Sequence, residues 1–428
     1  MRIIKNPAQD ALKEILKRPV IDVSQLNNTV GTILKDIKQG GDKAVLHYEK
    51  ILDKVDLHSL MVSDEEIYQA QFLISNELKE AILAAHKNIR TFHEAQKTEV
   101  HKIETMPGVT CWQKSIAIDK VGLYIPGGTA PLFSTVLMLA TPAKIAGCKE
   151  IILCSPPDKE GNINPAILVA AKIAGVGKIF KIGGAQAIGA MAYGTESTPK
   201  VYKIFGPGNQ YVMAAKQQVS IQDVAIDMPA GPSEVCIIAD ESGNPEFIAA
   251  DLLSQAEHGV DSQVVLICSS EEIVDKVKTE IDKQLHSLHR REIAAKALEN
   301  SVIIIVNNND EAMDISNAYA PEHLIIATKD YESLSEKVIN AGSVFLGKYA
   351  CESAGDYASG TNHTLPTHGY ATAYNGVNLD SYMRKITFQH LTKEGIASIG
   401  RTVEILAENE HLAAHKNAMT VRLNTLSD

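Results

Sequence analysis

The stretch that decides the fold runs from residue 201 to residue 219 and reads VYKIFGPGNQYVMAAKQQV. Residues 201–205 form an apolar run typical of a buried strand, and residues 209–219 have the spacing of a helix. Between them lies the glycine-rich turn Gly206-Pro207-Gly208-Asn209. A strand that passes through such a turn directly into a helix is the unit from which parallel sheets with crossover helices are built.

The same alternation continues on both sides of this stretch, in two consecutive series of similar size. The first series predicts strands at 111–118, 121–125, 151–154, 178–182, 201–205 and 224–226, and helices at 165–174, 185–193 and 209–219. The second predicts strands at 235–239, 264–268, 302–306, 324–327 and 344–346, and helices at 245–257, 271–285, 311–320 and 334–339. We therefore expect an α/β protein with two related parallel sheets, and ligands in a cleft at the carboxyl ends of the strands.

Regions outside these series are predicted to be helical extensions. Ser63 and Glu66 form a capping-box pattern, and an apolar stripe at helical spacing runs through residues 78–92. Residues 391–421 are predicted to be helical again. The expected organisation is a helical N-terminal region (1–109), a first α/β domain (110–232), a second α/β domain (233–370), and a C-terminal strand with a helical tail (371–428).

The composition excludes several classes of protein. The net charge of −11 and the aromatic content of 5% argue against a nucleic-acid-binding protein. No apolar run approaches the roughly 18 residues of a membrane helix, and the first residues lack the apolar core of a signal peptide. Six scattered cysteines without a C-x-x-C pair indicate a reducing cytoplasm, and Cys154, Cys236 and Cys268 are interpreted as core residues.

Three glycine-rich turns, each between a predicted strand and a predicted helix, could approach a phosphate through free N–H groups. No G-x-G-x-x-G or P-loop motif is present, so a nucleotide is not indicated by the usual fingerprint. Tight turns also require glycine for their own conformation, but three turns at one sheet edge favour a ligand. They are Pro126-Gly127-Gly128, Gly183-Gly184-Ala185-Gln186 and Gly206-Pro207-Gly208-Asn209.

Other segments carry residues suited to metal binding or proton transfer. Gln255 and His258 share one face of a predicted helix, where a capped helix end is an equally good interpretation. Glu322 and His323 are adjacent at a strand start, and either proton transfer or a solvated strand end would explain them. The remaining candidates are Asp356 and His363 in a loop rich in small residues, and Glu410 and His415 in the tail.

Taken together, these segments resemble the histidinol dehydrogenases over about residues 22–422, with every motif position intact. The matching stretches are Val121-Gly122-Leu123-Tyr124-Ile125-Pro126-Gly127-Gly128, Phe205-Gly206-Pro207-Gly208-Asn209, Ala230-Gly231-Pro232-Ser233-Glu234, Ser254-Gln255-Ala256-Glu257-His258-Gly259, Tyr319-Ala320-Pro321-Glu322-His323-Leu324, Ser359-Gly360-Thr361-Asn362-His363 and His411-Leu412-Ala413-Ala414-His415-Lys416-Asn417-Ala418.

The resemblance implies two related, incomplete Rossmann-like domains in a cytoplasmic zinc-containing homodimer with shared active sites. It places NAD on the first domain, the metal and catalytic groups on the second, and gives the tail the role of completing the dimer. The resemblance implies zinc on Gln255, His258, Asp356 and the His415 contributed by the second subunit. It implies a general base at His323 and a water-activating acid at Glu322. Substrate contacts would be Ser233, His363 and Glu410 together with His323 and the metal-bound groups, and NAD contacts would be Tyr124, Gln186 and Asn209.

The implied reaction is the NAD-dependent, four-electron oxidation of L-histidinol to L-histidine through histidinal, the last step of histidine biosynthesis. The zinc would hold the imidazole of the substrate, with a Lewis-acid role as the alternative. Other interpretations are a related zinc-dependent dehydrogenase of another amino or sulfonated alcohol, a zinc hydrolase and a zinc-stabilised binding protein. The sequence leaves open whether manganese or cobalt replaces zinc.

Overall fold

The computed structural model describes residues 1–19, 24–127, 131–229 and 231–426. Asp22, where the resemblance begins, Gly128 of the first glycine-rich turn, and Ala230 lie outside these residues. The chain divides into two units, which are described one at a time. The larger unit comprises Met1–Ala95 and Asp119–Ser381, and the smaller comprises Gln96–Ile118 and Tyr382–Asp428.

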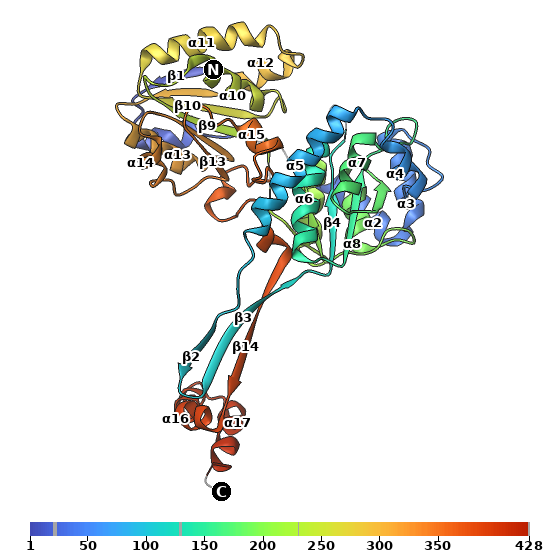
Figure 1. Ribbon diagram of the computed structural model, residues 1–428, viewed down its shortest axis with the longest axis vertical. Helices are drawn as coiled ribbons and strands as arrows, with labels where there is room; N and C mark the ends of the chain where they lie inside the picture. The colour runs from blue at the N-terminus through green and yellow to red at the C-terminus, as the bar shows by residue number, and fades with distance from the viewer. Residues whose placement is uncertain (20–23, 128–130, 230, 427–428) are drawn as a thin grey trace. The chain divides into compact units, whose positions relative to one another are not determined.

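The first sheet of the larger unit has five parallel strands in the order β6-β5-β4-β7-β8 (Figure 1). Its helices follow the strands as crossover connections, which confirms the predicted alternation. The strand predicted at 111–118 is not part of this sheet, because it forms an antiparallel strand of the smaller unit. Only the helix that follows β4 was not predicted. The elements are β4 (Lys120–Tyr124), α6 (Phe133–Ala146), β5 (Glu150–Ser155), α7 (Pro165–Ile173), β6 (Lys178–Lys181), α8 (Gly184–Tyr193), β7 (Lys203–Phe205), α9 (Gln210–Ser220) and β8 (Ala225–Ile226).

Helices from the N-terminal part of the chain cover this first layer. Ile33, Leu34 and Ile37 of α2 are buried and belong to the same apolar cluster as residues of α8 and α9. The predicted capping box is present, since Ser63 and Glu66 exchange side-chain and main-chain hydrogen bonds at the start of α4. These helices are α2 (Ser24–Gly40), α3 (Asp42–Tyr48), α4 (Asp64–Ala70) and α5 (Asn76–Glu94). The short helix α1 (Leu12–Ile15) packs instead against the core of the second sheet.

The second sheet has six parallel strands in the order β1-β11-β10-β9-β12-β13. The five strands of this sheet that follow β1 in the chain lie close to the predicted ranges, as do the helices at 245–256, 271–285 and 309–319, whereas the helices at 291–299 and 352–357 were not predicted. Cys236 and Cys268 are buried in the core of this sheet as expected. The α/β fold with two parallel sheets is therefore confirmed. The elements are β9 (Glu234–Ala239), α10 (Pro245–Ala256), β10 (Gln263–Cys268), α11 (Glu271–Leu285), α12 (Arg291–Glu299), β11 (Val302–Ile305), α13 (Asn309–Tyr319), β12 (His323–Ala327), α14 (Tyr331–Ser335), β13 (Ser343–Leu346) and α15 (Glu352–Tyr357).

The sixth strand, β1 (Arg2–Lys5), comes from the region that was predicted to be helical. It pairs in parallel with β11, in a register that places Arg2 opposite Val302. Four residues are too few to show a two-residue alternation, so this strand depends on its distant partner rather than on a local pattern.

The smaller unit contains an antiparallel sheet in the order β14-β3-β2 and two helices. Trp112 of β3 lies opposite Phe388 of β14, and the two rings stack with centroids 5.4 Å apart. The elements are β2 (Lys102–Met106), β3 (Val109–Ala117), β14 (Met383–Leu391), α16 (Lys393–Asn409) and α17 (Ala413–Asn424). None of the helices in the described ranges, in either unit, combines the length and the apolar character that a membrane span needs.

Candidate active site

The adjacent pair Glu322 and His323 lies where β12 begins, and both side chains are buried. His323 Nδ1 lies 3.1 Å from the main-chain oxygen of Glu234, and Glu322 Oε2 accepts a 2.9 Å hydrogen bond from the N–H of Glu234. Because a carbonyl oxygen can only accept, Nδ1 of His323 carries a proton. The other ring nitrogen, Nε2, is thereby left to face the site.

This position corrects the expected location of the cleft. His323 and Glu234 are the first residues of β12 and β9, so the pair lies at the amino edge of the second sheet, not at its carboxyl edge. Parallel α/β sheets usually bind ligands at the carboxyl ends of their strands, because the helix N-termini at that edge can bind phosphate. Here the neighbouring groups come instead from the end of α10 and from α15, which reach the opposite edge.

Asp356, on α15, faces Nε2, the second ring nitrogen of His323. Its Oδ1 is 3.3 Å from His323 Nε2. Burial alone would lower the pKa of His323, but the charge of Glu322 and the hydrogen bond to Asp356 raise it well above the usual value. Burial would raise the pKa of Asp356, but the hydrogen bond and charge of His323 lower it. The imidazole is thus held between the carboxyl groups of Glu322 and Asp356.

His363 connects the loop after α15 to helix α6. Its Nδ1 donates to the main-chain oxygen of Asp356 at 2.8 Å, and its Nε2 lies 3.0 Å from Thr135 Oγ1. The neighbouring Asn362 donates from Nδ2 to the main-chain oxygen of Met138 at 2.6 Å. Burial lowers the pKa of His363, so its imidazole is neutral near physiological pH.

Gln255 and His258 lie together at the end of α10. The helix ends at Ala256, so His258 is in the following turn, where its N–H donates to the main-chain oxygen of Gln255 at 3.2 Å. The side chain of Gln255 is 1% exposed and its Oε1 has no hydrogen-bond partner. A buried amide oxygen without a partner is costly, and a bound cation would satisfy it.

The groups near the side-chain oxygen of Gln255 would supply some, but not all, of the ligands of a metal ion. His258 is close enough to Asp356 for its charge to lower the pKa of that carboxyl group. Within the ranges that the structure describes, however, no three His, Cys, Asp or Glu side chains are grouped for metal binding. An amide oxygen, an imidazole and a carboxylate suit zinc, and a fourth ligand has to come from elsewhere.

Glu352 was not predicted from the sequence and adds a second buried carboxyl group to this region. Ser254 Oγ donates to its Oε1, its Oε2 has no partner, and burial raises its pKa to about 8. Its only signal was its place in the same small-residue loop as Asp356. Thr135 lay in an apolar stretch that gave no functional signal.

The three residues expected to contact NAD lie at the carboxyl edge of the first sheet. Tyr124 ends β4, Gln186 is in the first turn of α8 after β6, and Asn209 caps α9 after β7. Gly184 N–H donates to Tyr124 Oη at 3.1 Å, which joins two of these segments. A dinucleotide would fit this edge, where parallel α/β sheets bind ligands.

One of the three turns does not present the free N–H groups that were expected. Glu49 Oε1 accepts hydrogen bonds of 3.0 Å from both Gly183 N and Gln186 Nε2, and Asp53 Oδ2 accepts from Gln186 Nε2 at 2.8 Å. A carboxyl group of the chain therefore already occupies the N-terminus of α8, and a phosphate could reach these N–H groups only by displacing it. Glu49 and Asp53 lay in a region without motifs and were not predicted.

The remaining candidates are Ser233, which is next to Glu234 in the chain, and two residues of the smaller unit. Ser233 directly precedes Glu234, and its main-chain oxygen accepts from Gln263 N at 3.2 Å. Glu410 caps the end of α16 and His415 is in the first turn of α17, and both are exposed.

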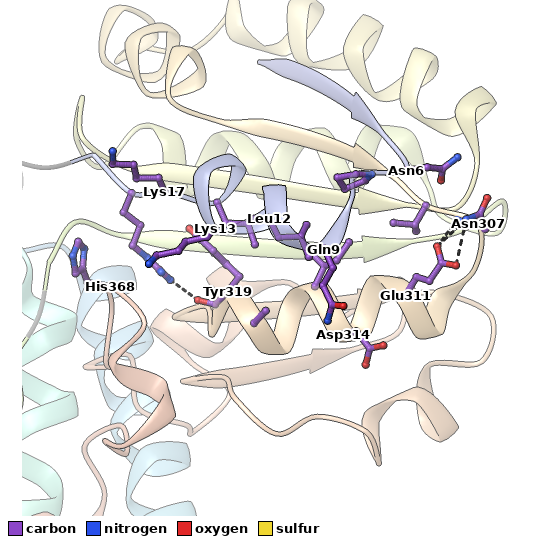
Figure 2. Close-up of a pocket in the computed structure, with 16 residues that line it drawn as sticks. Asn6, Gln9, Leu12, Lys13, Lys17, Asn307, Glu311, Asp314, Tyr319 and His368 are labelled. Atoms are coloured by element: carbon purple, nitrogen blue, oxygen red, sulfur yellow. Dashed lines mark hydrogen bonds between the residues drawn. The ribbon is translucent and has the colours of Figure 1, made fainter.

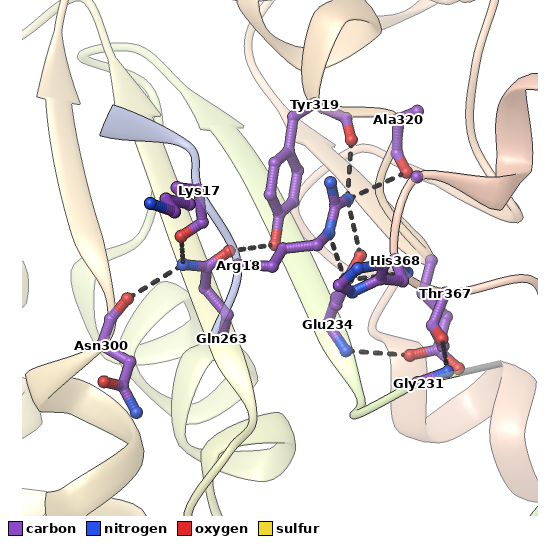
Figure 3. A network of polar contacts seen from close by, with 12 residues as sticks. Lys17, Arg18, Gly231, Glu234, Gln263, Asn300, Tyr319, Ala320, Thr367 and His368 are labelled. Carbon is purple, nitrogen blue, oxygen red and sulfur yellow. Dashed lines mark hydrogen bonds and ion pairs between the residues drawn. The ribbon is translucent and has the colours of Figure 1, made fainter. Parts of the chain in front are cut away.

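A pocket of about 870 Å³ is lined in part by Arg18, which binds the Glu234 side chain (Figure 2). None of the predicted site residues lines this pocket. Its walls come from the N-terminal segment and from α13, and they include Lys13, Arg18, Asp314, Tyr319 and His368. Arg18 binds Glu234 from this pocket, in the network shown in Figure 3.

Comparison with known proteins identifies the family of this chain. The family model for histidinol dehydrogenase matches residues 16–423. The histidinol dehydrogenase of Bacteroides thetaiotaomicron is 65% identical over 426 residues, covering 100% of both chains, and that of Escherichia coli is 51% identical, covering 97% of this chain and 96% of its own. The crystal structure of histidinol dehydrogenase from Elizabethkingia anophelis has a TM-score of 0.98 at 54% identity and covers 100% of this chain and 99% of its own. The chain belongs to the histidinol dehydrogenase family.

Proposed function

We propose that this chain, an oxidoreductase of histidine biosynthesis by its family, oxidises L-histidinol to L-histidine through histidinal with two molecules of NAD. The observation that carries the proposal is the buried Glu322–His323 pair, with Asp356 within 3.3 Å of the imidazole. A base and an acid side by side, facing a carboxylate that can hold a cation, supply the groups that both oxidation steps require.

The chain would hold two cofactors at different edges of its sheets. We propose NAD at Tyr124, Gln186 and Asn209, and zinc at Gln255, His258 and Asp356, with His415 of a second subunit as the fourth ligand. When bound, NAD would accept hydride, and zinc would hold the imidazole of the substrate and place positive charge beside Asp356.

In the alcohol step, His323 takes the hydroxyl proton through Nε2 as the carbon loses hydride. A cation held by Asp356 would offset one of the two carboxyl groups that raise the pKa of His323, and the imidazole would then be free to accept this proton. Nδ1 stays bonded to the main-chain oxygen of Glu234, so the ring keeps its orientation throughout.

In the aldehyde step, Glu322 orients and deprotonates a water molecule that adds to the carbonyl carbon. The resulting hydrate loses a second hydride and a second proton, and the product is the carboxylate. Ser233, His363 and Glu410 would bind the substrate. The Glu410 carboxylate suits its ammonium group, and the burial of His323 and Glu322 keeps bulk water away from the aldehyde.

We propose a homodimer in the cytoplasm, with two shared active sites and with neither nucleic acid nor membrane as a partner. The smaller unit carries several large apolar side chains that are exposed in the single chain, including Ile103, Leu406 and Leu412. Such side chains favour an interface with another subunit. The cysteines Cys111, Cys148, Cys154, Cys236, Cys268 and Cys351 are all free, which fits a reducing compartment.

Subunit sharing is tested by mixing a His415→Ala protein with a His258→Ala protein under conditions that exchange subunits. If the tail acts on the other subunit, the heterodimer has one site with both defects and one intact site, so part of the activity returns. If the tail closes on its own subunit, every site keeps one defect. Proven exchange without any recovery would exclude the shared site.

The reaction itself is tested by counting NADH formed per histidinol consumed, with His323→Asn as the inactive control. Two NADH per substrate is the expected result. One NADH with release of the aldehyde would mean a simple alcohol dehydrogenase, and no oxidation of histidinol by the metal-loaded protein would refute the proposed substrate.

A further inference from the structure

A single residue, Glu234, holds both members of the Glu322–His323 pair through its main chain. Its N–H donates to Glu322 Oε2 at 2.9 Å, and its C=O lies 3.1 Å from His323 Nδ1. The pairing of β9 with β12 begins one residue later, at Val235 opposite His323. The N–H and C=O of Glu234 are therefore hydrogen-bonded to the side chains of Glu322 and His323, and not to the main chain of β12.

The side chain of Glu234 is fixed by Arg18, from the N-terminal segment. Arg18 Nε and Nη2 lie 2.5 and 2.9 Å from the two carboxylate oxygens, as a bidentate pair. The arginine and glutamate side chains are only 14% and 2% exposed. The N–H of His368 also donates to Glu234 Oε1, at 2.9 Å. A buried, two-pronged ion pair of this kind fixes orientation as well as distance.

Arg18 also holds the segment that leads into the pair. Its Nη2 donates to the main-chain oxygen of Tyr319 at 2.7 Å and lies 3.4 Å from that of Ala320, while its guanidinium stacks on the Tyr319 ring at 4.1 Å (Figure 3). Ala320 has a φ of 52°, a left-handed conformation that costs free energy for a residue with a side chain. The contacts of Arg18 with the main-chain oxygens of Tyr319 and Ala320 help to hold the turn in this conformation.

We propose that Arg18 is a positioning residue for catalysis, which orients Glu322 and His323 through Glu234 and through the turn at Tyr319 and Ala320. The inference rests on the roles proposed above for Glu322 and His323. Arg18 touches neither of them, and it lies on the wall of the pocket in Figure 2, a place that gave no catalytic signal in the sequence.

The first experiment measures kcat and KM for histidinol in Arg18→Ala, with Lys13→Ala as a control on the wall of the same pocket. Displacing a catalytic pair by a fraction of an ångström to an ångström lowers kcat by about 10- to 100-fold. KM should change less than about threefold, since ground-state contacts are kept. Lys13→Ala should retain the activity of the parent protein.

Because Arg18 borders an open pocket, guanidinium ions can reach the space that Arg18→Ala leaves. Guanidinium, far below concentrations that unfold proteins, should restore part of kcat, and methylammonium at the same concentration should restore less, because it lacks the planar fork. A folded Arg18→Ala protein with the parent kcat would overturn the inference. So would a loss of kcat that guanidinium leaves unchanged.

A double variant separates positioning from stability if Arg18→Ala does not fold. Arg18→Met combined with Glu234→Gln removes both charges, so no unpaired charge is left buried and the fold should be retained. We expect this protein to melt near the parent temperature while its kcat stays low. Recovery of both stability and kcat would reduce Arg18 to a structural role and overturn the inference.

His323→Asn, measured in parallel, separates this inference from the proposed function. If His323→Asn retains full activity, the proposed catalytic pair is wrong. If His323→Asn is inactive while a folded Arg18→Ala protein has the parent kcat, the proposed function stands and only the positioning role fails.

Discussion

The buried carboxyl group of Glu49 should make the protein less stable as the pH rises. Glu49 lies beneath the Gly183-Gly184 turn with no exposed surface, and burial, followed by the charge of Asp53, raises its pKa from 4.5 to about 8. Between these two values the folded protein keeps the proton, whereas the unfolded chain has released it. The folded state binds more protons, so raising the pH favours unfolding.

The size of the effect follows from the difference between the two pKa values. Titration of Glu49 alone lowers the free energy of unfolding by roughly 3 to 4 kcal/mol between about pH 5 and about pH 8. In Glu49→Gln the amide oxygen can still accept from Gly183 and Gln186, but nothing titrates at this position. Relative to the parent protein, the variant should therefore gain roughly the same free energy over this pH range.

Urea unfolding at several pH values tests this prediction, with Glu80→Gln as a matched control. Glu80 is exposed on α5, so its replacement should leave the pH profile of the parent protein unchanged. Parallel stability profiles for the parent protein and Glu49→Gln would show that Glu49 is ionised in the folded protein. The raised pKa of Glu49, on which this prediction rests, would then be wrong.

Three further predictions concern the zinc site, the catalytic pair and the turn at Gly206. His258→Asn should contain less zinc than the parent protein by metal analysis after dialysis near neutral pH, and full retention of zinc would remove His258 from the ligand set. His323→Asn should slow histidinol oxidation by about a hundredfold through loss of the base, whereas Glu322→Gln should slow histidinal oxidation more than histidinol oxidation; equal effects of Glu322→Gln on the two substrates would reject this division. Gly206→Ala should lose at least about 2 kcal/mol of unfolding free energy, because φ is 128° and the new Cβ would lie 2.1 Å from the main-chain oxygen of Tyr124; an unchanged melting temperature would contradict that close approach.

Much of the fold was predictable because its strands are buried and its helices are capped by local residues. The runs that became β9, β10 and β11 are apolar throughout, as strands covered on both faces are. Helix α6 was missed because its buried residues surround it, which leaves no apolar stripe to detect. Strand β1 was missed because only its pairing with β11 makes it a strand.

The candidate site was predictable only where chemistry and chain order coincide. Glu322 and His323 are adjacent in the sequence, so their pairing could be anticipated. The contacts of Glu49 with Gln186 and of Arg18 with Glu234 join residues more than a hundred positions apart, and no local pattern encodes them. The placement of the pair at the amino edge likewise follows from how α10 and α15 fold back.

Strand β1 also bears on how the protein is made. It leaves the ribosome before its partner β11, which follows three hundred positions later. At roughly 5–20 residues per second, about 15–60 s pass between the two. During that time Ile3 and Ile4 have no partner strand, and Arg18, a short distance along the same segment, cannot yet bind the turn at Tyr319 and Ala320. Strand β1 can therefore join this sheet only after β11 has been made, and its return would also bring Arg18 to Glu234.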